Sequence, residues 1–183
     1  MAEFLGKRFV SKSGSTILVR SATEADASHI LSLAKSVIGE EIYQLTSASE
    51  FRMTVDDEEK WIRNHLENPN HLLLVATLNN EVIGMLDFSN GHRQRIAHTG
   101  EFGMSVAKDF RGQGIGSFLL SSLFEWAKSN RNLEKINLSV HGNNERAVAL
   151  YKKMGFEVEG VRKKDLNYGD GKYIDTVLMG KFL

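Results

Sequence analysis

The stretch that decides the fold is Val106-Ala107-Lys108-Asp109-Phe110-Arg111-Gly112-Gln113-Gly114-Ile115-Gly116-Ser117. The preceding residues predict a strand, because Phe102, Met104 and Val106 alternate onto one face. The following residues predict an amphipathic helix with an apolar stripe of Ile115, Phe118, Leu119, Leu123 and Trp126. Three glycines crowd the start of that helix, although glycine destabilises helices. A helix start offers unpaired N–H groups and the positive end of a dipole, so the stretch predicts an anion-binding loop.

Three kinds of phosphate-binding loop can be compared with this stretch. A P-loop requires a lysine after its last glycine, whereas Ser117 follows Gly116. A Rossmann fingerprint that begins at Gly112 requires a third glycine where Ser117 stands. The pattern Arg/Gln-x-x-Gly-x-Gly/Ala is matched in full by Arg111, Gly114 and Gly116. It resembles the pyrophosphate loop of the GNAT superfamily of N-acetyltransferases; an ordinary glycine-rich turn is the alternative.

A second pattern follows at the spacing that the resemblance leads one to expect. A strand over residues 135–140 precedes a helix that starts at Asn143 or Asn144 and ends at Gly155. Its residues Asn144-x-x-Ala147-x-x-Leu150-Tyr151-x-Lys153-x-Gly155-Phe156 are similar to the second GNAT signature. Two signatures in the right order are far more specific than one, and the chain is identified as a member of the GNAT superfamily.

The composition bounds the class of protein. The hydrophobic fraction of 42% and charged fraction of 25% are those of a globular protein, and 183 residues predict a single domain over residues 1–183. The resemblance implies that this is an N-acetyltransferase domain. A net charge of zero argues against nucleic-acid binding. The absence of cysteine excludes an acyl-cysteine intermediate and zinc–thiolate sites. Residues 1–15 lack the apolar core of a signal peptide and no run approaches a membrane span, so we expect a cytoplasmic protein without membrane contact.

The remaining chain predicts the order of elements around the two signatures. A hairpin turns at Ser13-Gly14, Thr23 and Thr54 begin two helices, and the apolar run at residues 71–76 predicts a central strand. The fold class is therefore α/β (α+β). The resemblance implies the GNAT fold: a mixed, largely antiparallel sheet of about seven strands, with helices on both faces and two splayed parallel strands that form the acyl-CoA cleft.

The resemblance also implies how acetyl-CoA, the expected co-substrate, would bind. The pantetheine arm would lie along the backbone of the strand before the loop, the pyrophosphate on the loop's N–H groups, and Asn144 near the junction between them. The implied cofactor-binding residues are Met104, Ser105, Val106, Arg111, Gly112, Gln113, Gly114, Ile115, Gly116, Ser117 and Asn144. The six histidines lack metal-ligand spacing, and we expect no metal.

The expected reaction is direct attack of an amine on the thioester, without an acyl-enzyme. Tyr151 stands where family members place the general acid, and a phenol is protonated at neutral pH; packing of the helix is the alternative role. Glu101 can face the cleft and act as the base, directly or through water, or it is a solvated or paired carboxylate. Glu40, Glu41 and Glu50 could attract a cationic amine or simply form an exposed acidic helix end.

These features predict an N-acetyltransferase that acts on the primary amine of a small molecule. Acetylation of a protein or peptide N-terminus and a catalytically silent acyl-CoA sensor remain open. Ser139 occupies the position where some relatives that acetylate ribosomal proteins carry a glutamate. Acceptor specificity would lie in residues 37–55 and 163–172, and the resemblance also allows a homodimer through the C-terminal strands.

Overall fold

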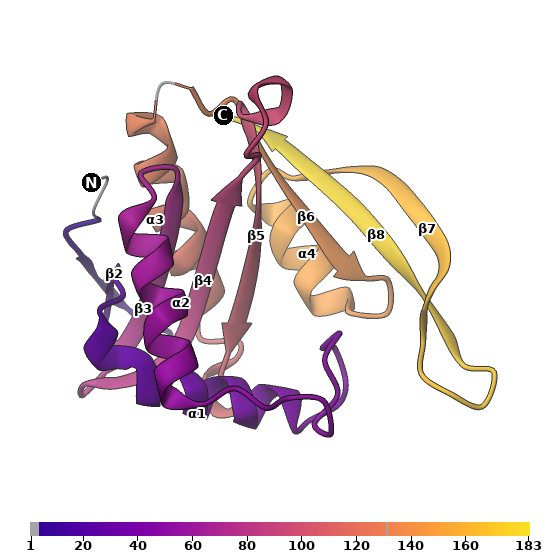
Figure 1. Ribbon diagram of the computed structural model, residues 1–183, viewed down its shortest axis with the longest axis horizontal. Coiled ribbons are helices and arrows are strands. Elements are labelled where there is room, and N and C mark those ends of the chain that lie inside the picture. The colour runs from indigo at the N-terminus through magenta and orange to yellow at the C-terminus, as the bar shows by residue number, and fades with distance from the viewer. Residues whose placement is uncertain (1–3, 131) are drawn as a thin grey trace.

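The computed structural model describes residues 4–130 and 132–183. Residues 1–3, which belong to the segment where no signal peptide is expected, lie outside the described residues, as does Arg131. Eight strands form one sheet in the order β1-β2-β3-β4-β5-β6-β8-β7 (Figure 1). Their bounds are Lys7–Val10 (β1), Thr16–Ser21 (β2), His71–Leu78 (β3), Glu81–Asn90 (β4), Thr99–Val106 (β5), Lys135–His141 (β6), Glu157–Asn167 (β7) and Tyr173–Phe182 (β8).

Four α-helices connect these strands, and local sequence explains where they begin. Their bounds are Ala27–Ile38 (α1), Val55–Glu67 (α2), Ile115–Ser129 (α3) and Glu145–Lys153 (α4), and short 3₁₀ turns lie at Glu24–Asp26, Gln94–Ile96 and Lys108–Phe110. Thr54 and Asp57 form a reciprocal capping box at α2, and Asn144 caps α4. Gly155 ends α4 with a φ of +87°, as predicted from its position.

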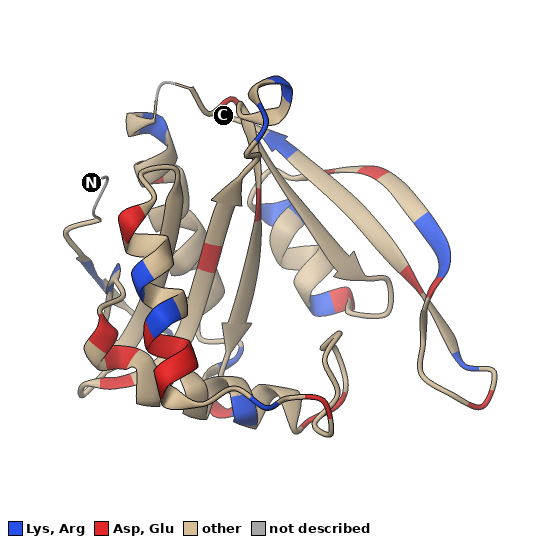
Figure 2. Ribbon diagram, viewed as in Figure 1, with Lys and Arg blue, Asp and Glu red and all other residues tan. Residues whose placement is uncertain are grey.

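The helices cover the sheet on both faces and divide the core into two clusters. On one face, α1 and α2 pack on residues such as Leu73 and Val75 of β3. On the other face, α3 packs through Leu119 and Leu123 on the same sheet, and α4 joins this cluster through Tyr151. Charged residues gather on the helices and the C-terminal hairpin, whereas the central strands carry few (Figure 2). The predicted mixed sheet with helices on both faces is confirmed.

The sheet has one parallel pair, β5 and β6, and this pair positions the site. The two strands are paired only from Thr99↔Lys135 to Glu101↔Asn137, and the rest of β5 has no partner on that side. β4 continues to pair with β5 as far as Val106. The predicted splay of two parallel strands is therefore confirmed. The sheet has one strand more than the seven or so expected, because β1 pairs with β2 along its whole length.

Candidate active site

A cleft of about 1380 Å³ opens where β5 and β6 separate. It extends from the loop before α3, across the unpaired end of β5, to the segment after α1. Successive strand residues point to opposite faces of a sheet, so Phe102 and Met104 face α3 and α4 while Glu101 and Gly103 face α1 and α2. The gap between the strands joins these two faces. All the predicted site residues line this cleft: Glu101, Met104, Ser105, Val106, Arg111, Gly112, Gln113, Gly114, Ile115, Gly116, Ser117, Asn144 and Tyr151.

The loop before α3 has the properties of an anion cradle. Gly112 and Gly114 have φ values of +82° and +100°, in the left-handed region that favours glycine. Within the described chain, the backbone N–H groups from Gly112 to Ser117 donate no hydrogen bond to a protein acceptor, and the first bond of the helix runs from the Phe118 N–H to the Gly114 carbonyl. These donors and the helix dipole suit a pyrophosphate, which acetyl-CoA carries.

Gly116 lets the first turn of α3 pack closely against α4 and β5. A Cβ atom at Gly116 would lie 2.9 Å from Cδ2 of Leu150 and 3.3 Å from Cε of Met104. Any side chain here would thus press on α4 or on the strand along which the pantetheine arm is expected. The absence of a side chain at Gly116 therefore lets the cradle lie close to β5 and α4.

Arg111 does more than place a positive charge beside the loop. Its guanidinium forms two hydrogen bonds with the Glu40 carboxylate, at 2.7 and 2.5 Å, and Nε donates to the Val106 carbonyl at 3.0 Å. The hydrogen bonds from Arg111 lower the pKa of Glu40, despite its partial burial. The backbone N–H of Arg111 is also engaged, with the Lys108 carbonyl. Arg111 therefore ties the segment after α1 to the cradle, and Glu40 lies at the cofactor end of the cleft.

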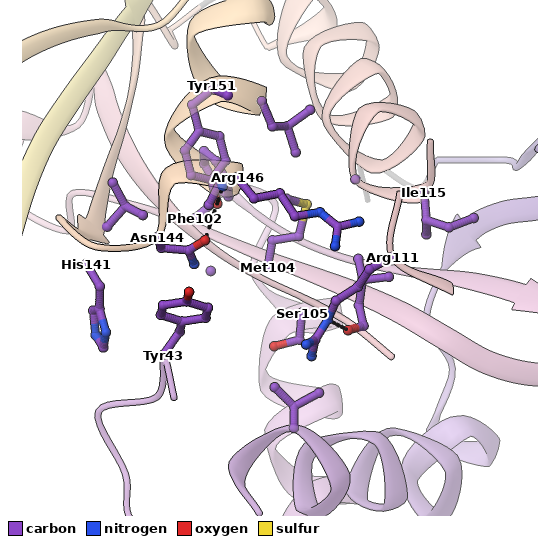
Figure 3. A pocket seen from close by; sticks show the side chains of 18 of the residues that line it. Tyr43, Phe102, Met104, Ser105, Arg111, Ile115, His141, Asn144, Arg146 and Tyr151 are labelled. Atoms are coloured by element: carbon purple, nitrogen blue, oxygen red, sulfur yellow. Dashed lines mark hydrogen bonds between the residues drawn. The ribbon is translucent and has the colours of Figure 1, made fainter. Parts of the chain in front are cut away.

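Asn144, which caps α4, and Arg146 in its first turn are among the polar residues that line the cleft (Figure 3). The Asn144 side-chain oxygen accepts from the Ala147 N–H at 3.2 Å, which leaves the amide nitrogen as the group that can reach a ligand. The Arg146 guanidinium comes close to Gly112, since a Cβ there would lie 3.1 Å from it. Arg146 therefore places a positive charge beside the cradle. The sequence analysis did not single out Arg146, although it lies two residues after Asn144 within the second signature.

Tyr151 lies on the face of the sheet that holds α3 and α4. Its ring packs edge-on against Phe102 and Phe156, with centroids 5.7 and 5.9 Å apart, and the residue is 8% exposed. Burial raises the pKa of Tyr151 to about 12. The phenol is therefore neutral at physiological pH and can donate a hydrogen bond into the cleft. The ring of Tyr151 can therefore pack in the core while its hydroxyl donates a hydrogen bond.

Glu101 lies on the opposite face, at the point where the strands part. Its carboxylate accepts a hydrogen bond of 2.9 Å from the Ser139 hydroxyl, which bridges β5 and β6. Glu101 and Tyr151 therefore approach the gap from opposite faces of the sheet. This arrangement can hold an amine on one side of a thioester and a hydrogen-bond donor on the other.

The end of the cleft beyond Glu101 is lined by the aromatic rings of Tyr43 and His141 (Figure 3). Tyr43 meets His141 edge-on, with ring centroids 6.2 Å apart. The Tyr168 hydroxyl, from the turn between β7 and β8, donates to the Ile42 carbonyl at 3.2 Å and lies 3.1 Å from Nδ1 of His141. Burial lowers the pKa of His141, so its ring is neutral near pH 7. Periodicity could not find this contact, because its partners come from segments far apart in sequence.

Two of the acidic residues expected to attract an amine are already engaged by other side chains of the protein. Glu40 pairs with Arg111, and Glu50 accepts hydrogen bonds from Ser47 at the surface. Asp87 of β4, which the sequence analysis passed over, lines the cleft instead. One signal could have found it: a carboxylate in the otherwise apolar run from Val82 to Phe88.

Residues 4–130 and 132–183 contain neither a cluster of metal ligands nor a membrane-spanning helix. No group of three or more histidines and carboxylates there is arranged to hold a metal ion. None of the helices in this part of the chain combines the length and the apolar character that crossing a membrane would require.

Known proteins resemble this chain in sequence and in structure. Residues 39–156 match the Acetyltransferase (GNAT) family. A relative named L-amino acid N-acetyltransferase AaaT, from Escherichia coli (strain K12), is 30% identical over 68% of this chain and 76% of its own length. The crystal structure of an acetyltransferase of the GNAT family from Streptococcus pneumoniae superposes with a TM-score of 0.87 at 29% identity, over 91% of this chain and 99% of that one.

A third similar protein is named for a different acceptor. The ribosomal-protein-alanine N-acetyltransferase from Brucella melitensis has a TM-score of 0.80 at 26% identity, over 90% of this chain and 99% of that one. The family match spans well over half of the chain and includes the loop, the splayed strands and α4. This chain therefore belongs to the GNAT family of acetyltransferases and is an acetyl-CoA-dependent acyltransferase.

Proposed function

We propose that the protein transfers the acetyl group of acetyl-CoA to the primary amine of a small molecule, by direct attack and without an acyl-enzyme. The observation that carries this proposal is the link across the acceptor end of the cleft, where the Tyr168 hydroxyl joins Ile42 and His141. A cleft bridged at this end suits a compact acceptor better than a polypeptide chain. The relative named L-amino acid N-acetyltransferase supports the same class of acceptor.

The predicted catalytic residues have complementary positions for this reaction. Glu101 is held by Ser139 and faces the side from which an amine would approach. It is the carboxylate that the sequence predicts as the base. Tyr151 faces the other side of the gap. A free thiol has a pKa of about 8.5. Full proton transfer from a phenol of pKa about 12 to a thiolate is therefore uphill. Tyr151 accordingly acts by donating a hydrogen bond to the departing sulfur.

The test is acetyl-CoA-dependent thiol release against a panel of primary amines, together with thermal unfolding in acetyl-CoA. The panel contains amino acids, polyamines, aminoglycosides and aryl-alkyl amines. A ligand at one hundred times its Kd adds about 2.7 kcal/mol to the free energy of unfolding. Stabilisation together with turnover of one amine class supports the proposal.

Acetylation of a protein N-terminus is the second candidate, and the resemblance to the ribosomal-protein-alanine N-acetyltransferase favours it. Peptides that begin with alanine are therefore included in the panel. Turnover of these peptides but of no free amine would replace the small-molecule proposal. Stabilisation by acetyl-CoA without turnover of any acceptor would indicate an acyl-CoA sensor.

A further inference from the structure

The turn between β1 and β2 is bound to the loop that forms the anion cradle. The backbone N–H of Lys12 donates to the Gln113 carbonyl at 3.1 Å, and the Ser13 hydroxyl donates to Oε1 of Gln113 at 2.7 Å. Gln113 in turn donates through Nε2 to the Asp109 carbonyl at 3.0 Å. Ser13 and Gln113 are 100 positions apart in the sequence, so the fold brings this turn to the cofactor end of the cleft.

Hydrogen bonds within the turn fix the backbone around Lys12. The Ser11 N–H donates to the Ser15 carbonyl at 2.9 Å, and the Ser15 N–H donates to the Ser11 hydroxyl oxygen at 3.1 Å. The Gly14 N–H donates to the Ser11 carbonyl at 2.9 Å, and its φ of +87° closes the turn. The backbone of Lys12 is therefore held in place, whereas its side chain is exposed.

The hairpin also packs on the first turn of α3. The rings of Phe9 and Phe118 stack, with centroids 4.6 Å apart and an interplanar angle of 12°. Phe118 lies two positions after Gly116, which is about 200° around the helix axis at about 3.6 residues per turn. Because Gly116 faces α4 and β5, the hairpin and α4 flank the start of α3 from opposite sides.

The two sides of this helix start would meet different parts of a coenzyme A molecule. The pantetheine arm is expected along β5, on the Gly116 side, and the pyrophosphate on the cradle. Coenzyme A carries its adenosine beyond the pyrophosphate, with a further phosphate on the 3′ oxygen of the ribose. The cleft continues past the cradle to Val10, Ser11 and Lys12, so it offers space for the nucleotide on the hairpin side.

Lys12 brings an unpaired positive charge to this end of the cleft. In the described part of the chain, neither a salt bridge nor a hydrogen bond engages its ammonium group. The other lysine of the hairpin, Lys7, is paired with Glu125 of α3 at 2.9 Å. Arg146 of α4 lies near Gly112, on the opposite side of the cradle. A ligand with two separate phosphate groups would therefore meet a cation on each side.

We propose that the β1–β2 turn completes the cofactor site and that Lys12 binds the 3′-phosphate of coenzyme A. This phosphate is a monoester with a charge of about −1.5 to −2 at pH 7, and a lysine binds such a group as a point charge. The inference goes beyond the proposed function, because it concerns the cofactor and holds for any acceptor amine. It also gives β1, the strand beyond the seven or so expected, a role in binding.

The test measures Kd by calorimetry for CoA and for 3′-dephospho-CoA, which lacks only this phosphate. We expect the wild-type protein to bind CoA about 3- to 10-fold more tightly, the size of one exposed charge pair with a phosphate. Lys12→Met removes the charge but keeps the backbone N–H that donates to Gln113. It should weaken CoA binding by the same factor and leave the Kd for 3′-dephospho-CoA unchanged. The wild-type preference should also shrink at high salt.

Two matched variants control for charge and for folding. Arg8 is exposed on β1, and alternation along the strand places it on the face opposite Phe9 and α3. Arg8→Met removes one positive charge from the same hairpin and should leave both Kd values unchanged. Lys12→Arg keeps the charge and should keep the preference for CoA. Without ligand, all three variants should unfold at the wild-type Tm.

Three results would overturn the inference. The first is equal binding of CoA and 3′-dephospho-CoA by the wild-type protein. The second is a Lys12→Met variant that retains the wild-type preference. The third is an equal loss of both ligands in Lys12→Met, which would assign Lys12 to the pyrophosphate instead. Failure of the wild-type protein to bind either ligand would overturn the cradle as the cofactor site, and this inference with it.

Discussion

Tyr151 illustrates how one residue can belong both to the core and to the chemistry. Its ring is packed by Phe102 and Phe156, and the same burial raises the pKa of its hydroxyl to about 12. Tyr151→Phe keeps the ring and removes only the hydrogen-bond donor. We expect kcat to fall by about 10²-fold with little change in thermal stability or in acetyl-CoA affinity. Steady-state kinetics and calorimetry check this.

The wild-type pH profile supplies an independent test of the same residue. A phenol with a pKa of about 12 does not ionise in the accessible pH range. Any alkaline fall in kcat below about pH 10 should therefore persist unchanged in Tyr151→Phe. Loss of that limb in the variant would contradict the hydrogen-bonding role.

At the residue scale, sequence could predict which residue types line the cleft but not that Asp87 is one of its carboxylates. The position of Asp87 depends on the register of β4 against β5 and on the missing side chain at Gly103. Likewise, the pairing of Arg111 with Glu40 joins residues 71 positions apart. Periodicity describes one element at a time, so it carries no information on such contacts.

At the scale of elements, the loop before α3 depends on backbone that only glycine adopts without strain. Gly114 has a φ of +100°, and a Cβ there would lie 3.1 Å from the Phe118 ring. We expect Gly114→Ala to reduce the free energy of unfolding by about 1–2 kcal/mol. It should also weaken acetyl-CoA binding, because the N–H groups of the cradle would move. Thermal unfolding with and without acetyl-CoA measures both effects.

The turn between β7 and β8 offers a matched control. Gly171 has a φ of +74°, and a Cβ there would meet nothing within 4 Å. Gly171→Ala should therefore cause a similar loss of stability but keep the full stabilisation by acetyl-CoA. Equal loss of acetyl-CoA binding in both variants would show that the cradle itself is not the binding site.

Helix α2 carries a carboxylate that opposes folding. Glu58 is 4% exposed, and burial raises its pKa. The folded state thus binds a proton more readily than the unfolded state, so stability falls as pH rises from the unfolded pKa through the folded one. Glu58→Gln should raise the Tm at pH 7, and the gain should disappear in acid. Glu59→Gln, one position along the helix and less buried, should not show this dependence.

Sequence predicted the elements well because their signals are local. The capping box of Thr54 and Asp57, the cap at Asn144 and the glycine at the end of α4 are all formed within a few residues. The two signatures lie on neighbouring elements, so the residues at the cofactor end of the cleft could be predicted from them. The acceptor end is built from separate segments, and no local pattern describes it.

At the scale of the whole molecule, the acceptor end is bridged by a contact between distant parts of the chain. The Tyr168 hydroxyl, from the C-terminal hairpin, reaches the Ile42 carbonyl and His141. Tyr168→Phe removes this link and keeps the ring. One hydrogen bond contributes about 0.5–1.5 kcal/mol, so KM for the acceptor should rise about 2- to 12-fold. Acetyl-CoA affinity should stay constant, because the cradle lies at the other end of the cleft.

Hydrogen exchange provides a readout of this contact that does not depend on knowing the acceptor. If the hairpin holds the segment after α1 in place, amides in residues 39–54 should exchange faster in Tyr168→Phe than in the wild-type protein. Tyr173→Phe, which removes a hydroxyl from the same hairpin near Lys164, should leave exchange and KM unchanged. Unaltered exchange in Tyr168→Phe would mean that the segment is held by its other contacts, chiefly Glu40 with Arg111. The Glu40–Arg111 pair at the cofactor end, and not the hairpin, would then determine the shape of the acceptor site.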